Sequence, residues 1–245
     1  MIEVLILTLM IVHVQQFTNS IYMHRGVAHG ALETHPWLAF IFRCLMWFTT
    51  YQMTGSNWLQ RYAAKHRMHH KYSDTKKDPH SPRYYSLKQL TNWRHSVHPG
   101  NANYISESDI KTYAPDVKTP DTWIDRNIFQ KYPFLGTEIA VAVLLVELGW
   151  WGLLPSFIIL KNGFFGTYII NYLSHKFGYK NYNVDDDSRN IFPIGIFQCG
   201  DELHNNHHRF PNGVTTRCRW WEFDLGYVYI KLLSFVGLIK INEKH

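Results

Sequence analysis

Residues 134–174 read FLGTEIAVAVLLVELGWWGLLPSFIILKNGFFGTYIINYLS and form the strongest apolar block of the chain. Its 41 residues include only three charged side chains. Because about 20 apolar residues in a helix cross the hydrocarbon core of a bilayer, the stretch is long enough to cross twice. Two glycines and Pro155 lie near its middle. We therefore expect two membrane helices, over residues 134–150 and 153–174, joined by a tight turn.

The rest of the chain alternates between charge-poor and charge-rich blocks. Four of the 44 Asp, Glu, Lys and Arg residues lie in residues 1–60 and three in residues 133–175, which leaves 37 for the other 142 residues. The mean hydropathy of -0.24 therefore averages two different environments. We expect a third membrane helix over residues 2–22, which lacks the basic start and the small-residue cleavage site of a signal peptide.

Eight of the 15 histidines form three motifs beside the apolar blocks. The first, His24 to His29, reads H-x4-H; residues 66–70 and 204–208 both read H-x2-H-H. At positions i, i+3 and i+4 of a helix, three imidazoles lie on one face and can converge on one centre or on two adjacent ones. The H-x4-H spacing does not share a face of an α-helix, so we expect a helix that ends between its histidines, at Gly26.

The type of ligand restricts which metals the site can bind. Imidazole sets suit iron, copper, nickel or zinc, whereas magnesium and calcium need carboxylates. Eight histidines exceed what one metal needs, since a catalytic zinc takes three and a water. We expect two redox metals and oxygen chemistry on an apolar substrate. The 3 cysteines exclude a disulfide-stapled secreted domain. The net charge of +6 points to a membrane surface or a phosphorylated substrate and not to nucleic acid, because the basic residues are mixed with acids.

The histidine motifs must meet on one side of the membrane to build one site. If residues 2–22 cross the membrane, a further crossing by residues 36–54 would place the second motif on the opposite side from the first. Residues 36–54 also contain Arg43, and a charged side chain in lipid is costly. We predict an interfacial or re-entrant segment there. The predicted fold is a single all-α domain over residues 1–245, with integral membrane helices and a cytosolic helical cap, residues 61–132 and 176–245, that holds a histidine-rich di-metal site.

In type, order and spacing the three motifs resemble those of the membrane fatty acyl desaturases of the stearoyl-CoA desaturase type, especially short bacterial members. The resemblance runs from about Tyr22 to Ile241. It includes the flanking segments HKYSDT at 70–75, DPH at 78–80, GDELH at 200–204 and HRFP at 208–211.

The resemblance implies two iron ions (Fe2+), with O2 as co-substrate. It adds His175 as a ninth histidine ligand and Asn171 as a ligand through water. The expected histidine ligands are His24, His29, His66, His69, His70, His175, His204, His207 and His208. The acids Asp78, Asp201 and Glu202 either orient the imidazoles or are solvated loop carboxylates. Among the histidines outside the motifs, which we interpret as structural or incidental, His80 is the best candidate for an outer-shell role.

Substrate contacts are also implied. Gln52, Trp58 and Thr167 fall at positions that line the acyl tunnel in this family. A role in the core is equally plausible for Trp58. Lys71, Lys76, Lys77 and Arg83 follow the second motif and either hold a phosphorylated headgroup such as that of coenzyme A or form a solvated basic loop.

The implied activity is the O2-dependent insertion of a cis double bond, at the delta-9 position, into a saturated fatty acyl chain, with acyl-CoA as the expected substrate. We expect neither the additional first helix of four-span members nor the cytochrome b5 domain that is fused to some relatives. Electrons are therefore expected from a separate protein: a ferredoxin, a cytochrome b5 or a flavoprotein reductase. In a bacterium we expect the cytoplasmic membrane, with the site on its cytoplasmic side.

Two alternatives stay open. A membrane di-iron hydroxylase or alkane monooxygenase shares such histidine motifs but inserts oxygen. A histidine-rich metal transporter or sensor would have its ligands inside the membrane helices, whereas these motifs flank them. The sequence leaves the double-bond position and the acyl carrier open between coenzyme A, carrier protein and lipid.

Overall fold

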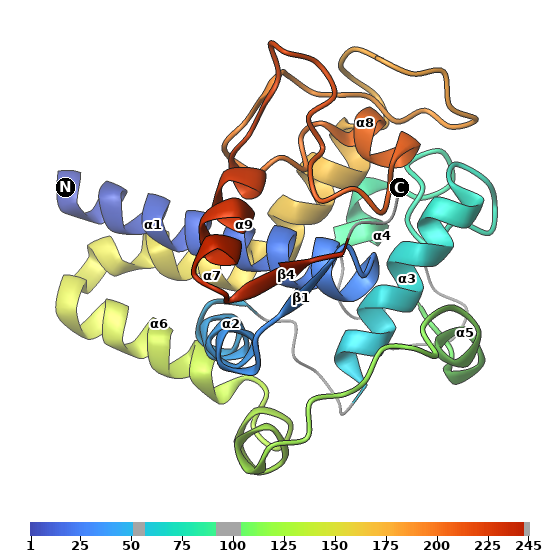
Figure 1. Cartoon of the computed structure of the whole chain (residues 1–245). Coiled ribbons are helices and arrows are strands. Elements are labelled where there is room, and N and C mark those ends of the chain that lie inside the picture. The colour runs from blue at the N-terminus through green and yellow to red at the C-terminus, as the bar shows by residue number, and fades with distance from the viewer. Residues whose placement is uncertain (51–56, 92–103, 243–245) are drawn as a thin grey trace.

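The computed structural model describes residues 1–50, 57–91 and 104–242, without the side chains of 91, 162–165 and 167–169 (Figure 1). The α-helices are α1 (Ile2–Thr18), α2 (Pro36–Thr49), α3 (Trp58–Tyr72), α4 (Leu87–Thr91), α5 (Glu107–Tyr113), α6 (Leu135–Leu148), α7 (Leu153–Gly166), α8 (His204–Arg209) and α9 (Leu225–Phe235). Wider π-helical turns are η1 (Asn19–Ala28), η3 (Asp125–Phe129) and η5 (Thr167–Leu173), and η4 (Gly149–Gly152) is a 3-10 turn. The mainly helical fold predicted from the sequence is confirmed.

The strands are few and short. Antiparallel β1 (Leu32–Thr34) and β4 (Ile239–Ile241) join the segment after the first histidine motif to the C-terminal end of the chain. Parallel β2 (Ile194–Gly195) and β3 (Phe223–Asp224) tie together the loops around α8. Both pairs lie in the polar part of the molecule, where they hold long connections in place.

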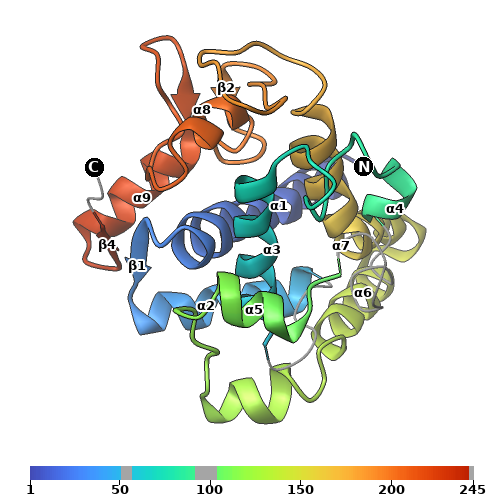
Figure 2. The same ribbon diagram turned by 90° about the vertical axis from the view of Figure 1, so that its right-hand side faces the viewer.

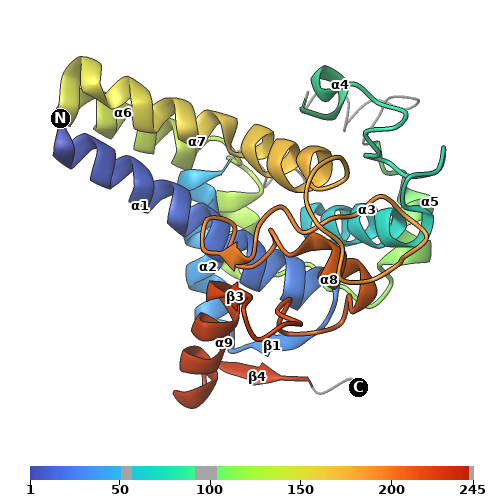
Figure 3. The ribbon, with the colours of Figure 1, turned by 90° about the horizontal axis from the view of Figure 1, so that it is seen from above.

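Two helical runs in the described part of the chain are long and apolar enough to cross a membrane, Ile2–Ala28 and Leu135–Lys161. The second run is broken at Gly149, whose φ of +55° favours glycine, so α6 and α7 fold back on one another. Helix α7 also packs along α1, and the three helices extend together to one side of the molecule (Figures 1 and 3).

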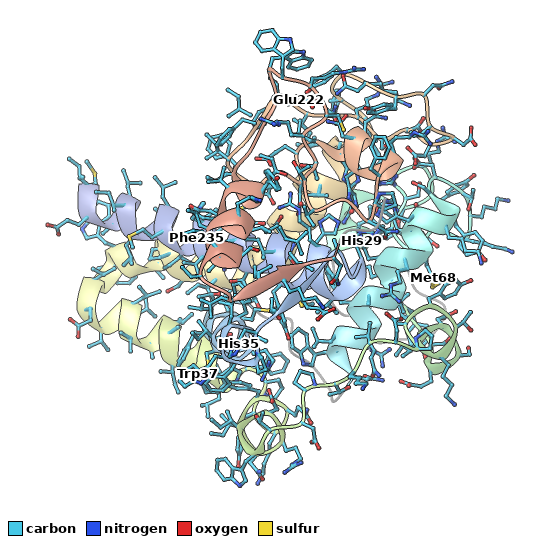
Figure 4. All side chains as sticks on the ribbon, viewed as in Figure 1. His29, His35, Trp37, Met68, Glu222 and Phe235 are labelled. Atoms are coloured by element: carbon cyan, nitrogen blue, oxygen red, sulfur yellow. The ribbon has the colours of Figure 1, made fainter. Side chains whose placement is uncertain are left out.

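Helices α2 and α9 run across the direction of α1 at the base of this helical layer (Figures 1 and 3). Helix α9 buries Ile230 but leaves Phe235 91% exposed, and the start of α2 leaves Trp37 68% exposed. Figure 4 places both aromatic residues on the side toward which α1 and α6 extend. A layer of exposed apolar groups on that side is typical of a surface that meets lipid.

Arg43 of α2 is buried in protein instead of facing lipid. Its guanidinium donates hydrogen bonds to both carboxylate oxygens of Asp125, at 2.8 and 3.1 Å. This ion pair ties α2 to η3, and Phe42 beside it stacks on Tyr22 of η1. The interfacial placement of residues 36–54 stays a prediction, and residues 51–54 lie outside the described part of the chain.

Candidate metal centre

The first histidine motif lies on the π-helical turn η1, at the polar end of the long first helix. A π-helix repeats its hydrogen bonds at i and i+5, and the amide of His29 donates to the carbonyl of His24 at 3.1 Å. The expectation that the helix ends at Gly26 was therefore wrong. The wider turn brings residues five apart onto one face, so both histidines of H-x4-H point to the same place.

The second and third motifs lie on α3 and α8. In each, the pair at i and i+4 points to one group of histidines and the residue at i+3 to the other. The five-histidine cluster contains His24, His29, His66, His70 and His207, and the four-histidine cluster contains His69, His175, His204 and His208. In each cluster the candidate ligand atoms all lie within 4.8 Å of one another. The chain thus forms two adjacent groups, each of which could hold a metal ion.

The ring nitrogens face one another at close range. In the five-histidine cluster, Nε2–Nε2 distances are 2.9 Å for His24 and His207, 2.8 Å for His29 and His66, 3.0 Å for His66 and His70, and 2.8 Å for His70 and His207. In the four-histidine cluster they are 3.2 Å for His69 and His208, 3.2 Å for His175 and His204, and 3.0 Å for His204 and His208. Metal–nitrogen bonds of about 2.1 Å at right angles place two nitrogens about 3.0 Å apart. The spacing fits neighbouring ligands of one ion.

The hydrogen bonds of His69 and His208 give a chemical reason to expect a metal ion between the two rings. Each ring donates its Nδ1–H to a carboxylate, at 2.9 Å to Asp78 and at 2.7 Å to Asp186. Both Nε2 atoms then carry lone pairs, which face each other at 3.2 Å. Two lone pairs at this distance repel unless they share a cation, so the donor set fits a bound metal ion.

The electrostatic environment keeps these imidazoles in the form that binds metal. Burial, followed by the proximity of other imidazoles, lowers the pKa well below the usual histidine value for His29, His66, His70, His204, His207 and His208. Neutral imidazole is the ligand species, so the site needs no proton release from these side chains near pH 7.

Four buried or half-buried aspartates orient four of the rings through Nδ1. Asp201 accepts from His24 at 3.0 Å and Asp74 from His175 at 2.8 Å, in addition to the two pairs above. Although burial raises it, the hydrogen bond from His175 and further donors lower the pKa of Asp74 to about 2. A carboxylate at Nδ1 fixes the tautomer and raises the basicity of the ligand. Three of these four aspartates accept hydrogen bonds from histidines of the four-histidine cluster. The imidazoles of that cluster are therefore more electron-rich than those of the five-histidine cluster.

The acids only partly match the sequence-based expectation. Asp78 and Asp201 contact imidazoles as expected, whereas Glu202 accepts the backbone amides of Gln198 and Gly200 and holds the turn before α8. Asp74 and Asp186 were missed. Asp74 stands in the quoted HKYSDT flank, but its partner His175 is 101 residues away, so no local spacing could reveal the pair.

A buried ion pair joins the first motif to the segment after the third. The Arg25 side chain is 2% exposed and the Asp224 side chain 1%, and one guanidinium nitrogen donates to both carboxylate oxygens at 3.1 and 3.2 Å. Asp224 also caps α9 by accepting the amide of Tyr227 at 2.9 Å. A Cβ at Gly226 would meet the guanidinium at 2.1 Å, so only glycine leaves room for the arginine.

The remaining sequence-based candidates are placed as follows. Asn171 is half-buried on η5, one turn before His175, and its role through water stays a prediction. Gln52 and the Thr167 side chain lie outside the described part of the structure. Trp58 begins α3 and is 5% exposed in the core. His80 is buried with its ring 4.3 Å from that of His69, and its nitrogens have no hydrogen-bond partner within the described residues.

The four basic candidates do not form one cluster. Lys71 and Lys77 lie over the ring of Tyr72, at 5.4 and 5.5 Å from its centre. Lys76 is exposed, and Arg83 forms an ion pair with Asp187. The roles of these four residues as headgroup contacts stay predictions.

Replacing Asp78 by asparagine is expected to lower metal affinity about 10- to 100-fold, because the change removes the charge that orients His69 but keeps the size of the side chain. The measurement is retention of Fe2+ by the purified protein against a chelator. Asp109→Asn, in the capping box of α5, is the matched control. Equal metal retention in both variants would contradict a role for Asp78 at the site.

Comparison with known proteins identifies relatives. A family model described as fatty acid desaturase matches residues 2–232. The chain is 30% identical over 226 residues to an sn-1 stearoyl-lipid 9-desaturase of Anabaena variabilis, covering 90% of this chain and 78% of that protein. It is 30% identical to an enzyme of the same name from Synechocystis sp., covering 89% of this chain and 64% of that protein. It is also 30% identical to a hex-5-enoyl-(acyl-carrier protein) acetylenase of Moorena producens, covering 90% of this chain and 70% of that protein.

Proposed function

The chain belongs to the fatty acid desaturase family, and from this premise we propose that it inserts a cis double bond at the delta-9 position of a saturated acyl chain, with O2 as the oxidant and two irons held by the nine histidines. The observation that supports this most is the convergence of four separate segments into two adjacent imidazole clusters at the polar end of apolar helices. Membrane association is supported by the same helices and by the family.

In this proposal the five-histidine cluster holds one iron and the four-histidine cluster the other. Bound iron would supply the capacity to use O2 for breaking unactivated C–H bonds. Burial keeps six of the nine ligand imidazoles neutral, and four aspartates fix the tautomers of four of the nine rings. Trp58, Gln52 and Thr167 are proposed to position one methylene pair of the acyl chain.

The reaction balance requires an outside reductant. Forming one double bond removes two hydrogens, that is two electrons and two protons, from the acyl chain. Reducing O2 to two waters consumes four of each. Two further electrons and two protons must therefore enter per turnover, and we propose that a separate one-electron carrier protein delivers these electrons.

The acyl carrier is proposed to be a membrane lipid. The sequence-based expectation of acyl-CoA has no support among the relatives reported above, two of which are named for lipid-linked stearate and one for an acyl-carrier protein. An acyl chain linked to lipid reaches the site from the bilayer side, along the apolar helices.

Expression in a host that lacks delta-9 desaturation is expected to produce monounsaturated acyl chains within intact membrane lipids. Mass spectrometry of the lipid classes, with double-bond location, gives the product, its position and its carrier. A product heavier by one oxygen instead of lighter by two hydrogens would establish a hydroxylase. An unchanged lipid profile in cells that contain the folded protein would contradict the proposal and favour a metal transporter or sensor.

A further inference from the structure

A short turn between the third histidine motif and α9 exposes two adjacent tryptophans. Residues 217–222, here called the tryptophan turn, read RCRWWE and lead directly into β3. Trp220 is 90% exposed and Trp221 is 43% exposed. Neither ring contributes to the candidate metal centre. Because a large apolar ring is costly to leave in water, two neighbouring indoles at the surface indicate a contact outside the fold.

The tryptophan turn is held rigid by the buried carboxylate of Glu222, which is 2% exposed. This carboxylate accepts the backbone amides of Cys218 and Arg219 at 2.8 and 2.9 Å, and the amide of Glu222 donates to the carbonyl of Arg219 at 3.1 Å. The carboxylate also accepts from the side chain of Asn206 of α8 at 2.8 Å. The tip of the turn is therefore ordered before any partner binds, and it is tied to the helix that carries the third motif.

Exposed apolar side chains continue from the tryptophan turn to the side that faces lipid. Phe223 of β3 pairs in register with Ile194 of β2, and both are exposed. Helix α9 follows at once and exposes four apolar side chains along its length: Val228, Leu232, Phe235 and Val236. Figure 3 shows β3 and α9 at the level where α2 crosses α1, and Figure 4 places Glu222 beyond the start of α9. The turn thus lies where the apolar helices meet the polar cap.

The segment that contains the tryptophan turn presents only positive charge to the outside. All five basic side chains between residues 205 and 242 are exposed: Arg209, Arg217, Arg219, Lys231 and Lys240. The two acids of this segment, Glu222 and Asp224, are 2% and 3% exposed and point inward. Apart from Lys240, which pairs with Glu33, none of the five forms an ion pair within the described residues. This surface is complementary to anionic phosphate groups.

We propose that the tryptophan turn binds anionic phospholipid at the surface of the bilayer. In this arrangement Trp220 and Trp221 insert among the lipid headgroups, and Arg217 and Arg219 bind lipid phosphates. The inference rests on the membrane location within the proposed function and not on the reaction. Tryptophan suits this position because its ring is apolar and its N–H group is polar, and arginine binds phosphate through two parallel hydrogen bonds. Since Glu222 ties the turn to α8, this contact sets the height of the metal centre above the bilayer.

Insertion is tested with the full-length protein in lipid nanodiscs. The emission of Trp220 is obtained as the difference between the wild type and Trp220→Phe, a change at a 90% exposed position that should leave the fold intact. With phosphatidylcholine brominated on the upper part of its acyl chains, a quencher confined to the bilayer, we expect most of this emission to be lost. Iodide, a quencher confined to the water, should remove little of it.

Selectivity for anionic lipid is tested by placing the bromine on one lipid at a time. In equal mixtures, brominated phosphatidylglycerol should quench Trp220 at least about twofold more than brominated phosphatidylcholine, because basic residues attract anionic lipid. Arg217→Glu combined with Arg219→Glu should abolish this difference, and Arg217→Glu alone should reduce it. The matched control is Lys111→Glu, which reverses an exposed charge on α5 and should leave the difference unchanged. Figure 2 shows α5 and α3 in front of α1, on the side away from the apolar helices.

The outcomes separate this contact from the proposed function. Emission of Trp220 that iodide quenches and brominated lipid does not would overturn the contact alone. Emission shielded from both quenchers would overturn it in favour of a second copy of the chain that covers the turn. Equal quenching by the two brominated lipids in the wild type would overturn the selectivity for anionic lipid. Release of the protein from membranes by alkaline carbonate would overturn the membrane location, and with it both the contact and the proposed function.

Discussion

Replacing His69 by alanine is expected to lower the formation of unsaturated product at least about 100-fold. Removing only a residue that orients a ligand typically lowers metal affinity or activity about 10- to 100-fold, and His69 is a ligand itself. The Nε2 atom of His69 belongs to the four-histidine cluster, 3.2 Å from that of His208. Its Nδ1 is bound to Asp78, and both side chains are fully buried. The change therefore removes a ligand and leaves a buried carboxylate without its partner.

Product from His69→Ala would be measured by gas chromatography of total fatty acids, and iron by elemental analysis of the purified protein. Bound iron should fall by about one equivalent, because the five-histidine cluster keeps its ligands. The control is His35→Asn, which alters an exposed histidine that caps α2 and keeps a side chain suited to that cap. Wild-type amounts of unsaturated product from His69→Ala would rule out His69 as a ligand.

Replacing Asp224 by alanine is expected to destabilise the folded protein by about 3–5 kcal/mol, because it leaves the buried guanidinium of Arg25 unpaired. Both side chains are at most 2% exposed. The change also removes the acceptor for the amides of Thr216 and Tyr227. For a chain of this size we expect the apparent Tm in detergent to fall by about 10 °C or more.

The exposed pair between Arg83 and Asp187 provides the matched comparison. These side chains are 52% and 36% exposed, so Asp187→Ala should cost less than about 1 kcal/mol. Thermal unfolding of the two aspartate variants would be followed by size-exclusion fluorescence. Similar Tm shifts in both would show that burial of the Arg25–Asp224 pair is not what holds the two histidine motifs together.

Much of the helical fold could be predicted because apolar length and charge-poor blocks are local properties of the sequence. The 134–174 stretch predicts two helices and a turn, and residues 135–173 contain α6 and α7 on either side of η4. Eight of the nine histidines were predicted from the motifs and His175 from the family resemblance, and the structure brings all nine together in two adjacent clusters.

The partition of these histidines could not be predicted, because the i, i+3, i+4 spacing allows one centre or two. It depends on how α3 and α8 face one another. The π-helical turn at the first motif was also missed, because an i+5 repeat has no signature separate from a helix end. The aspartate partners of His175 and His208 lie in loops, where no periodic pattern places a side chain. We interpreted Arg43 from the energetic cost of placing its charge in lipid. Its ion-pair partner Asp125 could not be predicted, because it lies 82 residues further along the chain.

In the proposed function the nine histidines hold two irons that carry out the desaturation. The most direct measurement is elemental analysis, combined with Mössbauer spectroscopy, of protein produced with 57Fe and purified from membranes. We expect two irons per chain in nitrogen-rich coordination, with loss of iron and of unsaturated product in parallel when a chelator is added. A single metal per chain, or zinc in place of iron in protein that still forms the double bond, would contradict it.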